Sequence, residues 1–219
     1  MKTSIATVSI SGNFSEKPEA IAAGAMSSGA TEESNTIIVA LKNANYGGWV
    51  LAQIVDPAAA AFAHEAGVGA TGTVTLGGEV DPGRYAAVTV QAVVALLSDG
   101  QAQLETMGMD LEAGPTAVLK FENFIIVVLS HSVSLFDRAL YYANSCNPRG
   151  FDLVMMKLSH AEFHMYDAWI EKNFNIDAPG ATSANITSLS HTICARPTYP
   201  PGPAIKFVPK ATIFQQGAT

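Results

Sequence analysis

The chain has 219 residues, of which 48% are hydrophobic and 14% charged, with a formal net charge of −7 and a pI near 5.1. This length and apolar content suit one domain with a buried core, and extended disorder is not expected. The acidic balance leaves no basic patch to release counterions, so we expect no nucleic-acid partner. The best uncharged runs, 85–98 and 123–136, are shorter than the roughly 20 residues of a membrane-spanning helix.

The first 24 residues predict a short extension made of one strand and one helix. Apolar and small polar residues alternate over 2–10 and indicate a strand, and a helix is expected over 16–23 before Gly24 ends it. Small and polar residues over 25–35 are typical of a linker. KTSIATVSISG followed by EKPEAIAAG resembles the opening of sugar-phosphate isomerase and epimerase barrels. One strand and one helix cannot close an eight-stranded barrel, so isomerase activity is not inferred.

The middle of the chain is rich in β-branched and apolar runs, which predict strands. Asp99–Gly100 and Glu122–Asn123 each predict a hairpin turn, and Gly77 and Gly78 are expected to be turn glycines. The run 153–156 suits a strand that is covered on both faces. The expected strands are 49–55, 72–76, 85–97, 101–106, 116–121, 124–129 and 151–156.

Three segments carry helix start and stop signals. Asp56 followed by Pro57 gives an N-cap and a proline at the first helical position, and Gly67 ends that helix. Ser134 and Ser159 each have an acidic residue three positions later, which is the capping-box spacing. The expected helices are 57–66, 135–144 and 160–173, and 36–42 fits either a helix or a strand.

These elements predict an α+β fold with a single main domain. We expect a mostly antiparallel sheet built from residues 49–130, with the helices packed against it. The predicted organisation is an extension over 1–24, a linker over 25–35, a main domain over 36–200 and a proline-rich tail over 201–219.

The amino terminus and the cysteines predict the cellular compartment of the protein. Met1–Thr3 is not followed by the apolar core and cleavage site of a signal peptide. Cys146 and Cys194 are too few for a disulfide framework, and neither has a context that marks a nucleophile. His64, in the alanine-rich helix, is expected to be a surface or partly buried histidine. The sequence therefore predicts a cytoplasmic protein.

A polar stripe runs along the helix expected over 160–173. At about 100° per residue, four of its polar side chains fall on one face, and they are the candidate binding residues His160, His164, Asp167 and Glu171. Two imidazoles one turn apart and a carboxylate have a spacing that suits zinc, so His160 and His164 are the metal candidates. The pattern is not HExxH, because position 161 is Ala. The alternative is a solvated or interface-facing stripe.

Residues 157–166, with the run NFNIDAPGATSANITSLSHTICARPTYP, resemble the carboxyl-terminal domain of the microcystinase C-like (MlrC) proteins, the M81 metallopeptidase family. The resemblance extends back to about Thr36. It implies a hydrolase family with zinc-dependent members that act on peptide-like substrates. In such proteins the zinc ligands, an Asp and two His, belong to a separate amino-terminal domain with no counterpart in this chain. His131, in a segment that matches the family by position, is a further candidate binding residue.

Two hypotheses for function follow. In the first, the chain is the carboxyl-terminal domain of an M81-like zinc metallopeptidase and is inactive without the metal-ligand domain. A third ligand on the same helix face is poorly placed for tetrahedral coordination, so no catalytic residue and no tightly bound zinc is expected. The partner is then the missing amino-terminal domain or a second copy. In the second hypothesis, the chain is a non-catalytic binding or assembly module. A Ser-His-Asp nucleophile is not indicated, because there is no GxSxG motif.

Overall fold

The computed structural model describes residues 19–22, 33–78, 87–133, 138–156 and 170–175, together with positions 193, 195 and 210. The chain divides into two compact units, Met1–Ser183 and Ala184–Thr219, and every element below lies in the first. Within the described ranges, no helix has both the length and the apolarity to cross a membrane.

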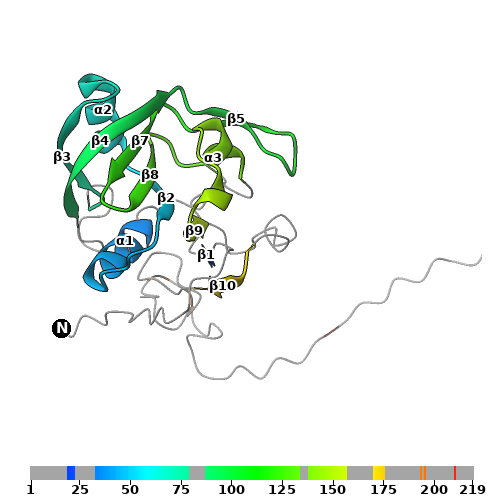
Figure 1. Ribbon diagram of the computed structural model, residues 1–219. Coiled ribbons are helices and arrows are strands. Elements are labelled where there is room, and N and C mark those ends of the chain that lie inside the picture. The colour runs from blue at the N-terminus through cyan, green and yellow to red at the C-terminus, as the bar shows by residue number, and fades with distance from the viewer. Residues whose placement is uncertain are drawn as a thin grey trace, which may run out of the picture. The chain divides into compact units, whose positions relative to one another are not determined.

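The described elements are short strands with a few helices between them (Figure 1). The strands are β1 (Glu19–Ala22), β2 (Val50–Val55), β3 (Thr71–Leu76), β4 (Val88–Ser98), β5 (Gln101–Gln103), β6 (Asp110–Glu112), β7 (Thr116–Phe121), β8 (Phe124–Leu129), β9 (Leu153–Met156) and β10 (Lys172–Asn175). The helices are α1 (Glu33–Asn43), α2 (Pro57–Ala66) and α3 (Ala139–Ala143), with a 3₁₀ turn over Pro148–Gly150. The mixed composition confirms the α+β class.

The main sheet has eight strands in the order β10-β1-β9-β2-β8-β7-β4-β3, and β5 pairs with β6 in a separate ribbon. From β8 to β3 every pairing is antiparallel, which agrees with the prediction for residues 49–130 except at the β2–β8 pair. From β10 to β8 every pairing is parallel. The whole sheet is therefore mixed. Parallel strands need a crossover, and α3 lies in the one that connects β8 to β9.

The two faces of the sheet carry two separate hydrophobic cores. On one face, the alternate residues Val50, Ala52 and Ile54 of β2 pack with side chains from α1 and α2. On the other face, Leu51 and Val55 pack with side chains from α3 and from the β5–β6 ribbon. This alternation follows from the two-residue period of a strand, and it explains why every residue of β2 is buried. β9 is also buried throughout, as predicted for a strand covered on both faces.

Helix α2 spans the predicted residues, and its N-cap residue also binds a backbone amide at the end of β3. Asp56 is buried, and its Oδ1 accepts a hydrogen bond from the Ala59 amide at 2.9 Å. Its Oδ2 accepts another from the Gly77 amide, at the end of β3, at 2.7 Å. Gly77 has a φ of +72°, and a Cβ there would lie 2.6 Å from the Asn35 side chain. The turn predicted at Gly77 is thus a junction between three elements.

The Asp56–Gly77 hydrogen bond shows that the sheet is strongly coiled. The register places Leu51 of β2 level with Thr71 of β3, by way of β8, β7 and β4. From that level β2 runs toward Asp56, whereas β3 runs in the opposite direction toward Gly77. In a flat sheet these two residues would lie at opposite edges. Because they are bonded, the strands must tilt and the sheet must curl toward closure, as in a barrel.

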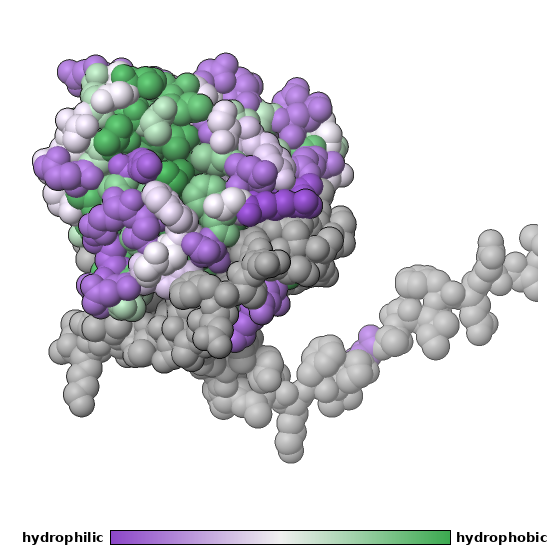
Figure 2. Space-filling view, viewed as in Figure 1, coloured by the Kyte–Doolittle hydropathy of each residue, from purple (hydrophilic) through white to green (hydrophobic). Residues whose placement is uncertain are grey.

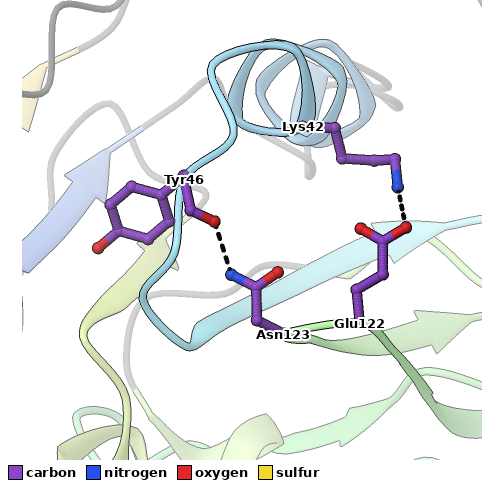
Figure 3. A network of polar contacts seen from close by, with 4 residues as sticks. All are labelled: Lys42, Tyr46, Glu122 and Asn123. Atoms are coloured by element: carbon purple, nitrogen blue, oxygen red, sulfur yellow. Dashed lines mark hydrogen bonds and ion pairs between the residues drawn. The ribbon is translucent and has the colours of Figure 1, made fainter.

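The amino-terminal end of β2 is fixed by a second polar network (Figure 3). Lys42, at the end of α1, pairs with Glu122 at 2.5 Å. Asn123 donates from its side-chain amide to the Tyr46 and Gly48 carbonyls. Glu122 has a φ of +48° in the tight turn between β7 and β8. The hairpin predicted at Glu122–Asn123 is therefore confirmed, and it also holds the loop from α1 to β2.

Several predicted elements are wrong. Residues 19–22 form β1, between β9 and β10, where the sequence favoured a helix over 16–23. Lys172 and Asn173 belong to β10 and not to a helix ending at 173. Asp99–Gly100 is a turn but not a hairpin, because β4 and β5 pair with different strands. In each case the structure depends on pairing with a strand that is distant in sequence, and the propensities of the segment itself do not indicate that pairing.

Helix α3 covers part of the predicted range 135–144, of which 135–137 lie outside the described residues. It spans Ala139–Ala143, and its N-cap position is Arg138, whose side chain makes no capping hydrogen bond. The proposed cap, Ser134, lies outside the described residues. The helix is attached to the sheet at two points, its middle and its C-cap: the Tyr141 hydroxyl donates to the Met155 carbonyl at 2.5 Å, and Ser98 donates to the Asn144 side chain at 2.7 Å.

Cys146 is buried beside α3, and desolvation raises its pKa to about 11. The thiolate is the reactive form, so at pH 8 the folded chain holds less of it than an ordinary cysteine would. In a Cys194→Ser variant, we expect Ellman's reagent to label Cys146 much more slowly in buffer than in urea. Absorbance of the released thiolate measures both rates. Equal labelling rates for the folded and unfolded chains would contradict the burial of Cys146.

Candidate functional site

The topology singles out one edge of the sheet, where the parallel strands β2 and β8 end. The chain leaves β2 at Asp56 and enters α2, which packs on one face. It leaves β8 after Leu129 and reaches α3, which packs on the other face. Adjacent parallel strands whose connections go to opposite faces form a topological switch point. In open α/β sheets, ligands bind at such points, outside the carboxyl ends of the strands, and it is by analogy with them that this edge of a mixed, curled sheet is taken as the candidate site.

The two connections are linked by a hydrogen bond at the point where they leave the sheet. The Asp56 amide donates to the Leu129 carbonyl at 2.9 Å, which continues the β2–β8 ladder by one step. Both carboxylate oxygens of Asp56 accept backbone amides, and the residue is 2% exposed. The carboxylate is therefore committed to holding α2 and β3 in place, and it is not available as a ligand group or base.

Three loops meet next to the ends of β2 and β8 and are connected by hydrogen bonds between their backbone groups. The Ala113 amide donates to the Gly100 carbonyl and the His131 amide to the Ala113 carbonyl, both at 2.9 Å. The Thr116 hydroxyl donates to the Gly114 carbonyl at 2.8 Å. These bonds connect the end of β4, the start of β7 and the end of β8. The backbone at this edge is thus fixed by contacts between segments that are far apart in sequence.

Two histidines lie at this edge in different environments. The ring of His131 rests on Gly114: a Cβ at Gly114 would lie 2.7 Å from Nδ1. His131 is exposed, and none of the described residues provides a hydrogen-bond partner for its ring nitrogens. In contrast, Nε2 of His64 on α2 lies 3.1 Å from the Thr116 carbonyl and is engaged there. His64 is exposed on the helix, in agreement with its prediction as a surface histidine.

The hydroxyl groups at the edge are also committed. Ser130 donates to the Pro115 carbonyl at 2.5 Å, and Thr116 donates to Gly114. Within the described ranges, neither hydroxyl is hydrogen-bonded to a histidine, so the arrangement does not form a serine or threonine nucleophile with its base. The edge offers one imidazole, on a rigid support, for contact with a ligand.

Only part of the predicted binding set can be placed. His131 lies at the switch point, and Glu171 is exposed directly before β10, outside any helix. His160, His164 and Asp167 lie outside the described residues. Because Glu171 and the residues after it are not helical, the helical stripe does not extend to its fourth predicted member.

The donor atoms in the described part of the chain do not fit a zinc ion. A zinc site needs three or four His, Cys, Asp or Glu side chains that converge tetrahedrally. The described residues contain no group of three such side chains that could hold a metal. No step of a zinc reaction is therefore assigned to them.

Sequence reasoning missed the residues that shape this edge. Gly114, with a φ of +66°, was not identified, and Gly100, with a φ of +74°, was predicted only as part of a hairpin turn. The signal that was present is a glycine directly before Pro115 and a second one after Asp99, each at the end of a predicted strand. Nothing in the local sequence indicates that these two glycines meet.

Comparison with known proteins gives a family and a fold. The family model described as the MlrC C-terminus matches residues 25–192. A crystal structure named "Putative metallopeptidase from Mesorhizobium sp. BNC1" superposes with a TM-score of 0.76 at 22% sequence identity. The alignment covers 89% of this chain and 40% of that one, so this chain spans about two fifths of the length of that protein. A search of curated proteins found no match.

Proposed function

The chain belongs to the MlrC C-terminus family, and from this premise we propose that it is the carboxyl-terminal domain of an M81-like zinc metallopeptidase or hydrolase that takes its zinc ligands from outside the family-matched residues. The observation that carries the proposal is the mismatch in length. The fold accounts for nearly all of this chain but less than half of the similar metallopeptidase. The remainder of such a protein has room for the ligands that the described residues do not assemble.

In this proposal the carboxyl edge of β2 and β8 faces the substrate. The partner is the region that carries the metal ligands, or a second copy of the chain, and the substrate is peptide-like. The setting is the cytoplasm, which agrees with a buried, unpaired Cys146. The domain contributes a rigid surface that closes and shapes the pocket, because the loops at that edge are cross-connected by backbone hydrogen bonds.

A peptidase assay on the purified chain tests this proposal. We expect no cleavage of a fluorogenic peptide library above buffer background, with or without added zinc, and no change on addition of a chelator such as EDTA. The matched control is the same protein after heat denaturation, which sets the background for contaminants. Cleavage by the folded chain that zinc restores after chelation would refute the proposal, because a full set of ligands would then lie within this polypeptide.

The second candidate function, a non-catalytic binding or assembly module, is supported by exposed apolar side chains. Figure 2 shows a hydrophobic area over the part of the molecule where Figure 1 labels α2 and β4. Large apolar side chains exposed on or next to these elements are Phe62, Val68 and Val93. Exposed apolar area of this kind promotes association. Light scattering on the eluting peak of a sizing column separates a monomer from an assembly.

A further inference from the structure

His131 differs from the other polar side chains at the switch point. Asp56, Thr116 and Ser130 all use their side chains to hold backbone groups, and His64 is engaged by the Thr116 carbonyl. None of the described residues occupies the ring nitrogens of His131, although its amide is fixed by the Ala113 carbonyl. The side chain is therefore positioned but not used within the fold.

The position of the ring is set by glycine. The imidazole lies against Gly114, where even a methyl group would come within 2.7 Å of Nδ1. Gly114 has a φ of +66°, a conformation that a side chain rarely adopts, so the backbone and the contact both require glycine. Gly100 in turn lies against the Gly114 carbonyl. The ring thus packs against Gly114, and His131 as a whole is exposed.

The chemistry of a free imidazole indicates what it can recognise. Neutral histidine has one N–H donor and one acceptor nitrogen. A peptide group has the complementary pair, a carbonyl acceptor and an N–H donor. The fixed support reduces the conformational entropy that binding would otherwise cost.

From the topology and these contacts, we propose that His131 hydrogen-bonds a backbone peptide group of the substrate at the switch point between β2 and β8. This inference rests on the proposed function, since it assumes that this edge faces a peptide-like substrate. His131 acts as a binding residue that orients the substrate, and the bond-breaking chemistry belongs to the metal region.

Binding of a capped tetra-alanine peptide to the full chain tests the inference. The ring resonances of His131, assigned by their loss in His131→Ala, are followed by NMR during the titration. We expect saturable shifts at His131 and at least about threefold weaker binding in His131→Ala, which corresponds to the loss of one hydrogen bond. His131→Gln, which keeps a donor and an acceptor, should recover part of the affinity.

The matched control is His64→Ala, because His64 is the other exposed imidazole at this edge and is already engaged. It should bind the peptide as the parent chain does. Equal affinities for His131→Ala and the parent would overturn the inference, as would an absence of saturable shifts at the His131 ring. These results are distinct from failure of the proposed function, which shows as zinc-dependent cleavage by the chain itself.

Discussion

Replacing Asp56 with alanine is expected to lower the free energy of unfolding by about 3 kcal/mol, because two buried contacts are lost together. Loss of an N-cap costs about 1 kcal/mol. Loss of a hydrogen bond to a charged acceptor costs about 1.5–3 kcal/mol, and here it leaves the buried Gly77 amide without a partner. Urea unfolding followed by circular dichroism measures the difference.

The matched control for Asp56→Ala is Asp56→Asn, which keeps the N-cap oxygen and loses only the second acceptor. It should retain roughly the capping contribution of about 1 kcal/mol relative to alanine. Hydrogen exchange should rise at the end of β3 in both variants, because both lose the acceptor of the Gly77 amide, and at the start of α2 only in Asp56→Ala. If alanine and asparagine were as stable as the parent, the coiled closure of the sheet by Asp56 would be refuted.

Replacing Gly100 with alanine is expected to destabilise the fold by about 2–5 kcal/mol. A Cβ at Gly100 would lie 2.1 Å from the Gly114 carbonyl oxygen and 2.8 Å from the Thr116 hydroxyl. The φ of +74° adds about 1–2 kcal/mol for any L side chain. The contact is with backbone, so no rotamer change relieves it, and overpacking of this kind costs about a further 1–3 kcal/mol. Thermal and urea unfolding measure the effect.

Gly47→Ala is the control for this substitution, since a Cβ there meets no atom within 4 Å and its φ is not in the left-handed region. It should be within about 0.5 kcal/mol of the parent chain. The ring resonances of His131 should move in Gly100→Ala and stay unchanged in Gly47→Ala, because Gly100 supports the loop on which that ring rests. Equal stability of the two variants would show that the three loops do not meet as described.

The parts of the fold that follow from the sequence depend on signals within a few residues. Asp56 followed by Pro57 starts α2, and Gly67 ends it, because a cap and a proline act on the adjacent turn. Glu122–Asn123 makes a hairpin because the flanking strands are neighbours in sequence. The run 153–156 is apolar on both sides because it is buried on both faces.

The parts that did not follow depend on partners far away in sequence. β1 lies between β9 and β10, and no pattern within residues 16–23 reports those neighbours. The same holds for β10, which was expected to end a helix. The second role of Asp56 also needs Gly77, which meets it only because the sheet coils. Long-range register is therefore what local reasoning lacks.

For the site, the sequence supplied a residue but not its setting. His131 was predicted as a binding residue from a family resemblance, and that prediction stays open. The switch point and the glycine support exist only once β8 is paired with both β2 and β7. Glu171 was predicted on periodicity that ends before β10.

Zinc content tests the central claim most directly, namely that this domain shapes a metal site whose ligands lie elsewhere. The purified chain is dialysed against a small excess of zinc, passed through a desalting column and analysed by mass spectrometry for metal per chain. The account predicts far less than one zinc per chain, and a zinc content no higher than that of the chain dialysed against metal-free buffer. One zinc per chain that survives desalting and is removed by a strong chelator would contradict it.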